Sequence, residues 1–165
     1  MRRTARLLAA ALLTAGCGEA PAPDAGPAPD AEAPGFALPA LDGGAVALEG
    51  LRGRPVVLDF WATWCAPCVQ QVPVLNAFHE KHGDAAVVLG VSVDTDGRDV
   101  VAAFAAEHDI RYRVLLGSPD LARRYGALGF PTLFVVGPDG AIDSSHVGVV
   151  SEEELEAALA RVAPP

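Results

Sequence analysis

The chain has 165 residues, 51% of them hydrophobic, which is enough for one sizeable core but short for two. Its formal net charge is −9 at pH 7, which argues against a partner bound through its phosphates, such as nucleic acid. We therefore expect one globular domain with extensions and no nucleic-acid partner.

The N-terminus combines a basic start with a short apolar run. Residues 1–6 contain three arginines, and Leu7–Ala15 is largely apolar, a layout typical of a secretory signal peptide. The run is too short to span a membrane, because a spanning helix takes about 20 apolar residues. The sequence predicts a signal peptide over residues 1–16 and an extracytoplasmic protein, on the periplasmic side, where disulfides persist.

The stretch L-T-A-G-C, which ends at Cys17, resembles a bacterial lipobox, in which the cysteine is lipidated and becomes the new N-terminus. The alternative is ordinary cleavage with Cys17 left as a free thiol, but lipidation also accounts for the odd number of cysteines. Loss of residues 1–16 leaves 9 basic against 21 acidic residues, a formal charge of −12. Attachment to a membrane would then come from acyl chains on Cys17 and not from surface charge.

Residues 18–35 contain only Gly, Ala, Pro, Asp and Glu. Without large apolar side chains such a segment cannot offset the entropy lost on ordering. The sequence predicts that residues 17–35 form a lipid-anchored, disordered tether, which could hold a domain roughly 50 Å from a membrane at roughly 3.1 Å per residue. The folded domain is predicted over residues 36–165.

Three β-branched runs predict strands within the domain. Val56–Phe60, Ala86–Val93 and Thr132–Val136 are apolar with little alternation, which is typical of strands buried on both faces. The sequence G-P-D-G, Gly137–Gly140, predicts a turn that leads from the third run into a further antiparallel strand.

Helical segments are predicted between and after these strands. Cys65–His82 contains no glycine and stops at Gly83, and the Ala-rich segment Asp99–His108 keeps helical spacing. Near the C-terminus, Ser151 and Glu154 fit the two positions of a capping box. Strands that alternate with helices predict a layered α/β domain.

Two cysteines, Cys65 and Cys68, are separated by two residues and admit three interpretations. A zinc site needs four ligands, but Cys17 is assigned to the anchor, and His79 and His82 lie on a helix far from the pair, so no metal is predicted. A structural disulfide that closes a two-residue loop stabilises little. The remaining interpretation is a redox-active pair.

The expected local structure supports the redox interpretation. A strand leads into a helix here, so Cys65 falls at the helix N-terminus, where the macrodipole and free N–H groups favour a thiolate. Cys65 is therefore the expected nucleophile, and Cys68, one turn further on, can resolve a mixed disulfide. Pro67 is tolerated because the first helical turn needs no N–H donor there.

These motifs together resemble the thioredoxin superfamily, and with the signal and lipobox they are similar to its extracytoplasmic TlpA/ResA-like branch. The resemblance covers about residues 36–163 and implies a thioredoxin-like three-layer α/β/α sandwich with a mixed central sheet. The residues that carry it are W-A-T-W-C-A-P-C (Trp61–Cys68), Asp59, Pro73, G-F-P-T (Gly129–Thr132) and G-P-D-G.

The resemblance also implies roles for particular residues. Pro131 would be a cis proline that faces the cysteine pair, with Phe130 and Trp64 contributing to the substrate-binding surface. Asp59 lies inside an apolar run, where burial would raise the pKa of its carboxyl. It would accept the proton of Cys68, directly or through a water; the alternative is an aspartate at a strand end that faces solvent.

The sequence departs from the family pattern at two positions. The lysine that thioredoxin carries on the next strand is replaced near Gly90, and Gln71 stands where many TlpA-like proteins have glutamate. His146, Arg123 and Arg124 are interpreted as solvated surface residues with no catalytic role.

The direction of electron flow is predicted from the two residues between the cysteines. Reduction potentials span about −270 mV for thioredoxin to about −120 mV for the oxidant DsbA, and Ala66-Pro67 supplies no charge that would stabilise the thiolate further. We therefore expect a reductase without a cofactor. The resemblance implies protein disulfide substrates, such as apocytochrome c or copper-site cysteines, and a membrane thiol donor of the CcdA/DsbD type.

Three other protein classes are alternatives to a disulfide reductase. A peroxiredoxin-like antioxidant enzyme shares the fold but uses a P-x-x-x-T-x-x-C pattern, which this sequence lacks. A copper-handling protein of the Sco type uses C-x-x-x-C, one residue longer than the spacing here. A non-enzymatic interaction module would need neither cysteine.

Overall fold

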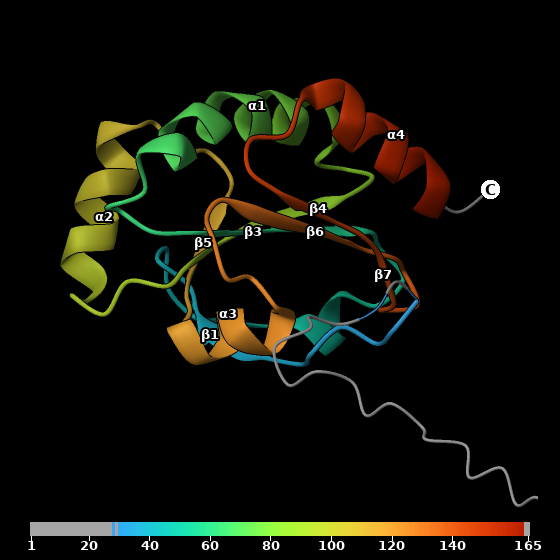
Figure 1. Cartoon of the computed structure of the whole chain (residues 1–165), viewed down its shortest axis with the longest axis horizontal. Coiled ribbons are helices and arrows are strands. Elements are labelled where there is room, and N and C mark those ends of the chain that lie inside the picture. Colours follow the sequence, from blue (N-terminus) through green and yellow to red (C-terminus); the bar gives the residue numbers. More distant parts are fainter. Residues whose placement is uncertain (1–27, 29, 164–165) are drawn as a thin grey trace, which may run out of the picture.

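A computed structural model describes residue 28 and residues 30–163 of the chain (Figure 1). The predicted signal peptide (1–16), the predicted lipidation site Cys17 and residues 18–27 of the predicted tether lie outside the described residues. Within the described part, no helix combines the length and the apolar character that crossing a bilayer requires.

The centre of the domain is a mixed sheet of five strands in the order β5-β4-β3-β6-β7. The first three strands run parallel, whereas β6 and β7 are antiparallel to their neighbours. The predicted strands and the predicted antiparallel partner after G-P-D-G are confirmed. The strands are β3 (Val56–Trp61), β4 (Val87–Ser92), β5 (Arg113–Leu116), β6 (Thr132–Val136) and β7 (Ile142–Val147).

Helices cover both faces of this sheet, which confirms the expected three-layer α/β/α arrangement. Helices α1 (Ala66–His82) and α4 (Glu152–Val162) pack side by side over one face, and α3 (Pro119–Tyr125) lies on the other (Figure 1). Helix α2 (Arg98–Glu107) lies toward the end of the sheet where β3 terminates, and its Phe104 stacks on Trp61 with ring centroids 4.9 Å apart.

The local signals that end and begin helices act as predicted. Cys65 is the N-cap of α1, and Ser151 caps α4 in a complete capping box with Glu154. These caps satisfy N–H groups that would otherwise lack a partner in the first helical turn.

The structure contains short elements that the sequence analysis did not predict. They are the hairpin β1 (Ala37–Pro39) and β2 (Ala45–Ala47), the 3-10 helix η1 (Leu48–Leu51), strand β5 and helix α3. Each has seven residues or fewer, and none contains the β-branched run or the turn signal that marked the equally short predicted strands. Their places are fixed by packing against the five-stranded sheet.

The last residues of the predicted tether belong to the fold. The backbone N–H of Asp30 donates to the carbonyl of Ile142 at 2.8 Å, and Ile142 donates back to Ala31 at 2.9 Å. Tyr125 Oη donates to the carbonyl of Pro34 at 2.7 Å, and Ala33 is buried. The folded region therefore starts by residue 30, before the predicted boundary at 36, because hydrogen bonds to the edge of the sheet order a segment that lacks large apolar side chains.

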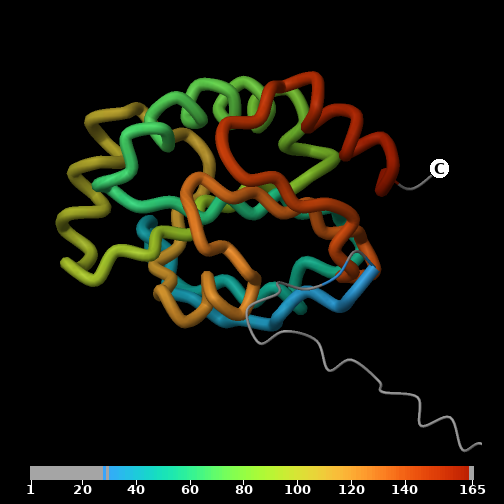
Figure 2. Tube along the Cα trace, viewed as in Figure 1, coloured from blue at the N-terminus to red at the C-terminus, as the bar shows by residue number. Residues whose placement is uncertain are grey.

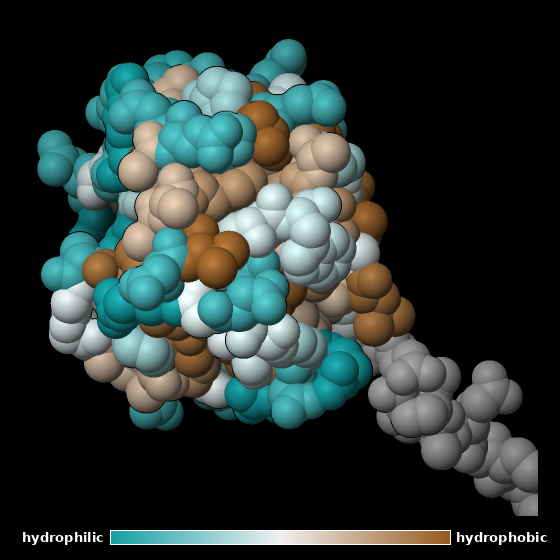
Figure 3. Space-filling view, turned by 90° about the vertical axis from the view of Figure 1, so that its left-hand side faces the viewer, coloured by the Kyte–Doolittle hydropathy of each residue, from teal (hydrophilic) through white to brown (hydrophobic). Residues whose placement is uncertain are grey.

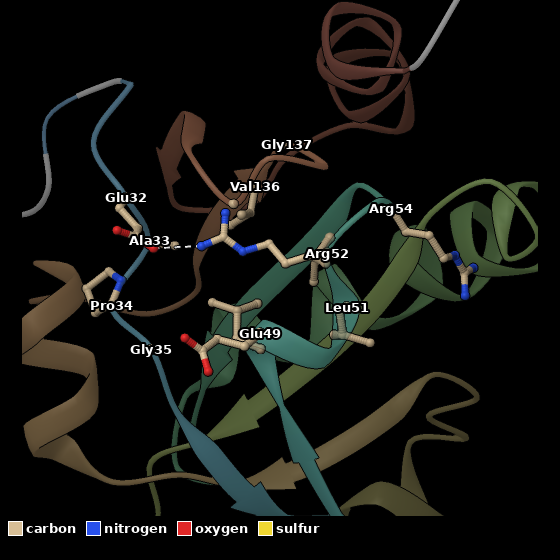
Figure 4. Close-up of a pocket in the computed structure, with 13 residues that line it drawn as sticks. Glu32, Ala33, Pro34, Gly35, Glu49, Leu51, Arg52, Arg54, Val136 and Gly137 are labelled. Carbon is tan, nitrogen blue, oxygen red and sulfur yellow. Dashed lines mark hydrogen bonds and ion pairs between the residues drawn. The ribbon is translucent and has the colours of Figure 1, made fainter.

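This segment lines a pocket of about 300 Å³ at the end of the sheet opposite the cysteines. Figure 2 traces the segment along the turn that follows β6. Arg52 Nη2 lies 2.6 Å from Glu32 Oε1, and Figure 4 shows this ion pair across the pocket. Arg52 also lies against Gly140, whose φ of +83 and lack of a side chain leave room for the guanidinium. The pocket thus marks where the N-terminal segment attaches to the domain.

Candidate active site

Cys65 and Cys68 form a disulfide at the N-terminus of α1, just after the carboxyl end of β3. Their Cα atoms are 5.4 Å apart, and the backbone N–H of Cys68 points to Cys65 Sγ at 3.3 Å. Pro67 lies in the first helical turn. The expected position of Cys65 at a helix N-terminus is confirmed, so an anionic sulfur there would face backbone N–H groups and the positive end of the helix dipole.

The loop before β6 lies at the same end of the sheet. The Phe130-Pro131 peptide bond is cis, as expected. Because β3 and β6 are antiparallel and Phe60 pairs with Thr132, this loop faces the end of β3 that leads to the cysteines. The rings of Trp64 and Phe130 meet edge to face with centroids 5.7 Å apart, so the two predicted substrate-contact residues form one aromatic pair.

Asp59 lies in the middle of β3 and is only 2% exposed. The solvent-facing alternative is therefore wrong. Burial raises the pKa of Asp59 from its ordinary value of 3.8 to about 7. Its Oδ1 has no hydrogen-bond partner within the described part of the chain, so no hydrogen bond to this oxygen offsets the effect of burial.

The structure explains the departure at Gly90, which pairs with Asp59 across β3 and β4. A Cβ at position 90 would lie 2.8 Å from Trp61 Nε1 and 2.9 Å from Tyr112 Cε2. Two aromatic side chains thus fill the space in which a lysine would begin. Burial and the charge of Asp59 in turn raise the pKa of Tyr112 well above its ordinary value.

A second aspartate, which the sequence analysis missed, holds the loop before Cys65. Asp94 follows β4, and its carboxylate accepts hydrogen bonds from the Thr63 hydroxyl at 2.6 Å and the Ser92 hydroxyl at 2.7 Å. The Thr63 N–H also donates to both carboxylate oxygens, at 3.1 and 3.2 Å. A polar residue directly after a buried parallel strand was the available signal, because such strand ends meet at one edge of a sheet.

We expect Asp94→Ala to lower the free energy of unfolding by about 2 kcal/mol, because it leaves several donors without their charged acceptor. Urea unfolding of the oxidised protein measures this change. Asp96→Ala is the matched control, since Asp96 is exposed two residues further on. Equal stability of the two variants would show that the carboxylate of Asp94 does not anchor the loop.

Four exposed apolar side chains lie on segments next to Cys65 or to the cis-proline loop. Trp64 and Leu128 are each 68% exposed, Val147 is 79% exposed and Val149 is 46% exposed. Val147 pairs with Thr132 beside the cis proline. Figure 3 shows the face that contains the N-terminus of α1, with apolar patches across its centre and hydrophilic residues around them. Of these four residues, Trp64 alone was predicted from the sequence to contact substrate.

Residues predicted to lie away from the site are spread over other elements. His79 and His82 belong to the last turn of α1, far along the helix from the cysteines. Arg123 and Arg124 are exposed on α3, as predicted. His146 differs from its prediction as a solvated residue: it is half-buried on β7, and its Nε2 is buried without a hydrogen-bond partner in the described residues. Among residues 28 and 30–163, no group of three His, Cys, Asp or Glu side chains is arranged to hold a metal ion.

Comparison with known families matches residues 29–145 to the AhpC/TSA family. The chain belongs to the AhpC/TSA family. It is 31% identical to the thioredoxin-like protein YneN of Bacillus subtilis (strain 168), over 78% of this chain and 76% of that protein. It is 30% identical to the thiol-disulfide oxidoreductase ResA of Bacillus thuringiensis subsp. konkukian (strain 97-27), over 81% and 78%.

A solved structure of a similar protein shows the same architecture. A crystal structure from Chlorobium tepidum, assigned as a thiol:disulfide interchange protein DsbE, superposes with a TM-score of 0.76 at 31% identity, covering 82% of this chain and 98% of that one. The resemblance to thioredoxin-like and ResA-like proteins, inferred from the motifs, is thereby confirmed. The AhpC/TSA match spans both the cysteine pair and the cis-proline loop.

Proposed function

We propose that this protein is an extracytoplasmic thiol–disulfide oxidoreductase that reduces disulfides in other proteins through Cys65 and Cys68. The observation that carries the proposal is the redox-capable cysteine pair at the N-terminus of α1, next to a strand that buries Asp59. Relatives that are named thiol-disulfide oxidoreductases support the reaction class.

The proposed reaction begins with the reduced protein. The thiolate of Cys65 attacks one sulfur of the substrate disulfide, a bond forms between the two sulfurs, and the other substrate sulfur leaves as a thiolate that takes up a proton. Cys68 then attacks Cys65 Sγ, which forms the disulfide seen in the structure and releases the second substrate sulfur. The substrate gains two electrons and two protons, and the protein dithiol loses them.

Asp59 supplies the acceptor for the proton that Cys68 loses, directly or through a water. Its pKa of about 7 suits this role, because a carboxyl group can both take and release a proton when its pKa lies near the working pH. Trp61 and Tyr112 fill the space beside Gly90 in which thioredoxin carries its lysine. Without that positive charge, burial is the cause of the raised pKa of Asp59.

The surface around the disulfide suits an unfolded or extended protein segment. Trp64, Leu128, Val147 and Val149 offer apolar contact area, and the cis-proline loop with Phe130 offers backbone groups beside Pro131. Such a combination binds many sequences, because main-chain contacts and apolar contacts depend little on side-chain identity. Apocytochrome c and copper-site cysteine pairs are substrates of the proposed kind.

The proposed localisation and partners follow from the N-terminal sequence. A signal peptide and acylation at Cys17 would place the protein at a membrane, and a tether would leave the domain within reach of a membrane thiol donor of the CcdA/DsbD type. Such a donor is needed because the domain ends each cycle oxidised.

The test is the equilibrium of the purified domain with glutathione and its activity on a protein disulfide with a dithiol as electron source. We expect a reduction potential below about −180 mV, the value of disulfide isomerases, and turnover of the protein disulfide. A higher potential would mean that the protein oxidises thiols. Consumption of peroxide instead of the disulfide would favour the peroxiredoxin alternative, and tight copper binding lost in Cys65→Ser would favour the copper-handling alternative.

A further inference from the structure

Gln71 lies on α1, three residues after Cys68, and its side chain is completely buried, with 0% exposed. Its amide makes two hydrogen bonds to the backbone of one residue. Nε2 donates to the carbonyl of Val150 at 3.2 Å, and the N–H of Val150 donates to Oε1 at 2.7 Å. The side chain thus pairs with Val150 as a neighbouring strand would.

Val150 ends the segment Val147–Val150, which begins at the last residue of β7. In this segment Val147 and Val149 are exposed on the apolar surface near the disulfide, whereas Val150 is buried. Gly148 lies between them with a φ of +92, in the left-handed region that favours glycine. Its N–H donates to the carbonyl of Pro131 at 2.9 Å. The segment is therefore fixed at two points, the cis proline and Gln71.

We propose that Gln71 is a positioning residue for the substrate-binding surface. It ties Val147–Val150 to the helix that carries both cysteines, so that the apolar contact area keeps a fixed distance from the sulfurs. The proposal rests on the proposed function, which it deepens: it assigns substrate binding, and not proton transfer, to this residue. A neutral amide suits this pairing because Val150 presents one donor and one acceptor, whereas an ionised carboxylate offers acceptors only.

The test is a steady-state comparison of Gln71→Met with Gln70→Met. Methionine matches the length of glutamine but makes neither hydrogen bond, and Gln70 is exposed on the same helix. For a protein disulfide, we expect KM of Gln71→Met to rise about tenfold while kcat stays within about twofold. The rate with glutathione disulfide and the equilibrium constant with glutathione stay within about twofold. Gln70→Met changes none of these values.

Two kinetic results would overturn the proposal. A parallel loss with both disulfides would mean that Gln71 acts on the chemistry of the cysteines, and a result equal to that of Gln70→Met would mean that it positions nothing. If Gln71→Met does not fold, the same measurements on Gln71→Asn test the proposal. The asparagine side chain has one methylene group fewer, so its amide does not reach the backbone of Val150.

Amide hydrogen exchange separates this proposal from the proposed function. We expect the amide of Val150 to exchange at least tenfold faster in Gln71→Met than in the wild type, with amides in β3 unchanged. If the wild type reduces no protein disulfide, the proposed function fails, and the exchange at Val150 still decides whether Gln71 holds the segment. Unchanged exchange would overturn the positioning role.

Discussion

Cys68→Ser is expected to accumulate as a mixed disulfide with its substrates, whereas Cys65→Ser is expected to lose at least about a thousandfold in disulfide reductase activity. The reason is the order of the two sulfur attacks. Cys65 caps α1, where backbone N–H groups and the helix dipole favour its thiolate, so we expect it to make the first bond to the substrate. Without Cys68 the bond between Cys65 and the substrate cannot be resolved.

The measurement is mass spectrometry of the trapped complexes after alkylation of free thiols. The double variant Cys65→Ser with Cys68→Ser is the control, because it retains the apolar surface but has no sulfur at the site. If Cys65→Ser forms the stable complexes and Cys68→Ser forms none, the roles of attacking and resolving sulfur are reversed. If both thiols of the reduced domain resist alkylation at neutral pH, the redox function itself is wrong.

Asp59→Asn is expected to stabilise the oxidised protein, and to do so more as the pH rises. Burial raises the pKa of the Asp59 carboxyl from 3.8 to about 7. Between these values the folded protein keeps the proton and the unfolded chain has lost it. The free energy of unfolding of the wild type therefore falls as the pH rises through this window, by roughly 4 kcal/mol in total at and above pH 7. Asparagine does not ionise, so the free energy of unfolding of Asp59→Asn lacks this fall with pH.

Urea unfolding of both proteins at pH 4 and pH 8 measures the effect. We expect the two proteins to differ little at pH 4 and by roughly 4 kcal/mol at pH 8. Asp84→Asn is the matched control, because Asp84 is exposed and its variant removes the same charge. A difference that does not change with pH would contradict the raised pKa of Asp59.

The same variant tests the catalytic role of Asp59. In the wild type we expect resolution of the mixed disulfide to speed up as Asp59 loses its proton near pH 7, since only the ionised carboxylate can accept the proton of Cys68. We expect Asp59→Asn to resolve about a hundredfold more slowly at pH 7 and to lack this rise. Stopped-flow kinetics with a preformed mixed disulfide reports the step directly. If the resolution rate of Asp59→Asn rises near pH 7 as in the wild type, the rise comes from ionisation of the cysteines alone.

The main strands, and the place of Cys65 at a helix N-terminus, could be predicted because the signals for them are local in sequence. The run at β3 is apolar at nearly every position, and Cys65 stands between that run and a helix whose first turn tolerates Pro67. The capping box of Ser151 and Glu154 is likewise complete within four residues. Signals of this kind act through the backbone of neighbouring residues, so no tertiary contact is needed to interpret them.

The end of the tether could not be predicted in this way. Residues 30–35 have the composition of a disordered segment, yet their backbone pairs with residues near Gly140 and Ile142, more than a hundred positions later in the chain. Composition reports whether a segment can bury its own side chains. It does not report whether a distant sheet edge offers free backbone partners.

The sequence by itself located the candidate reaction centre: two cysteines one helical turn apart, an aspartate six residues before the first, and a proline before a distant strand. Only the tertiary structure decided what surrounds that centre. The hydrogen bond between Thr63 and Asp94, the aromatic rings beside Gly90 and the pairing of Gln71 with Val150 each join residues about 20 to 80 positions apart. Such contacts depend on which strand ends and loops the sheet brings together, and that order follows from packing of the whole chain rather than from any local pattern.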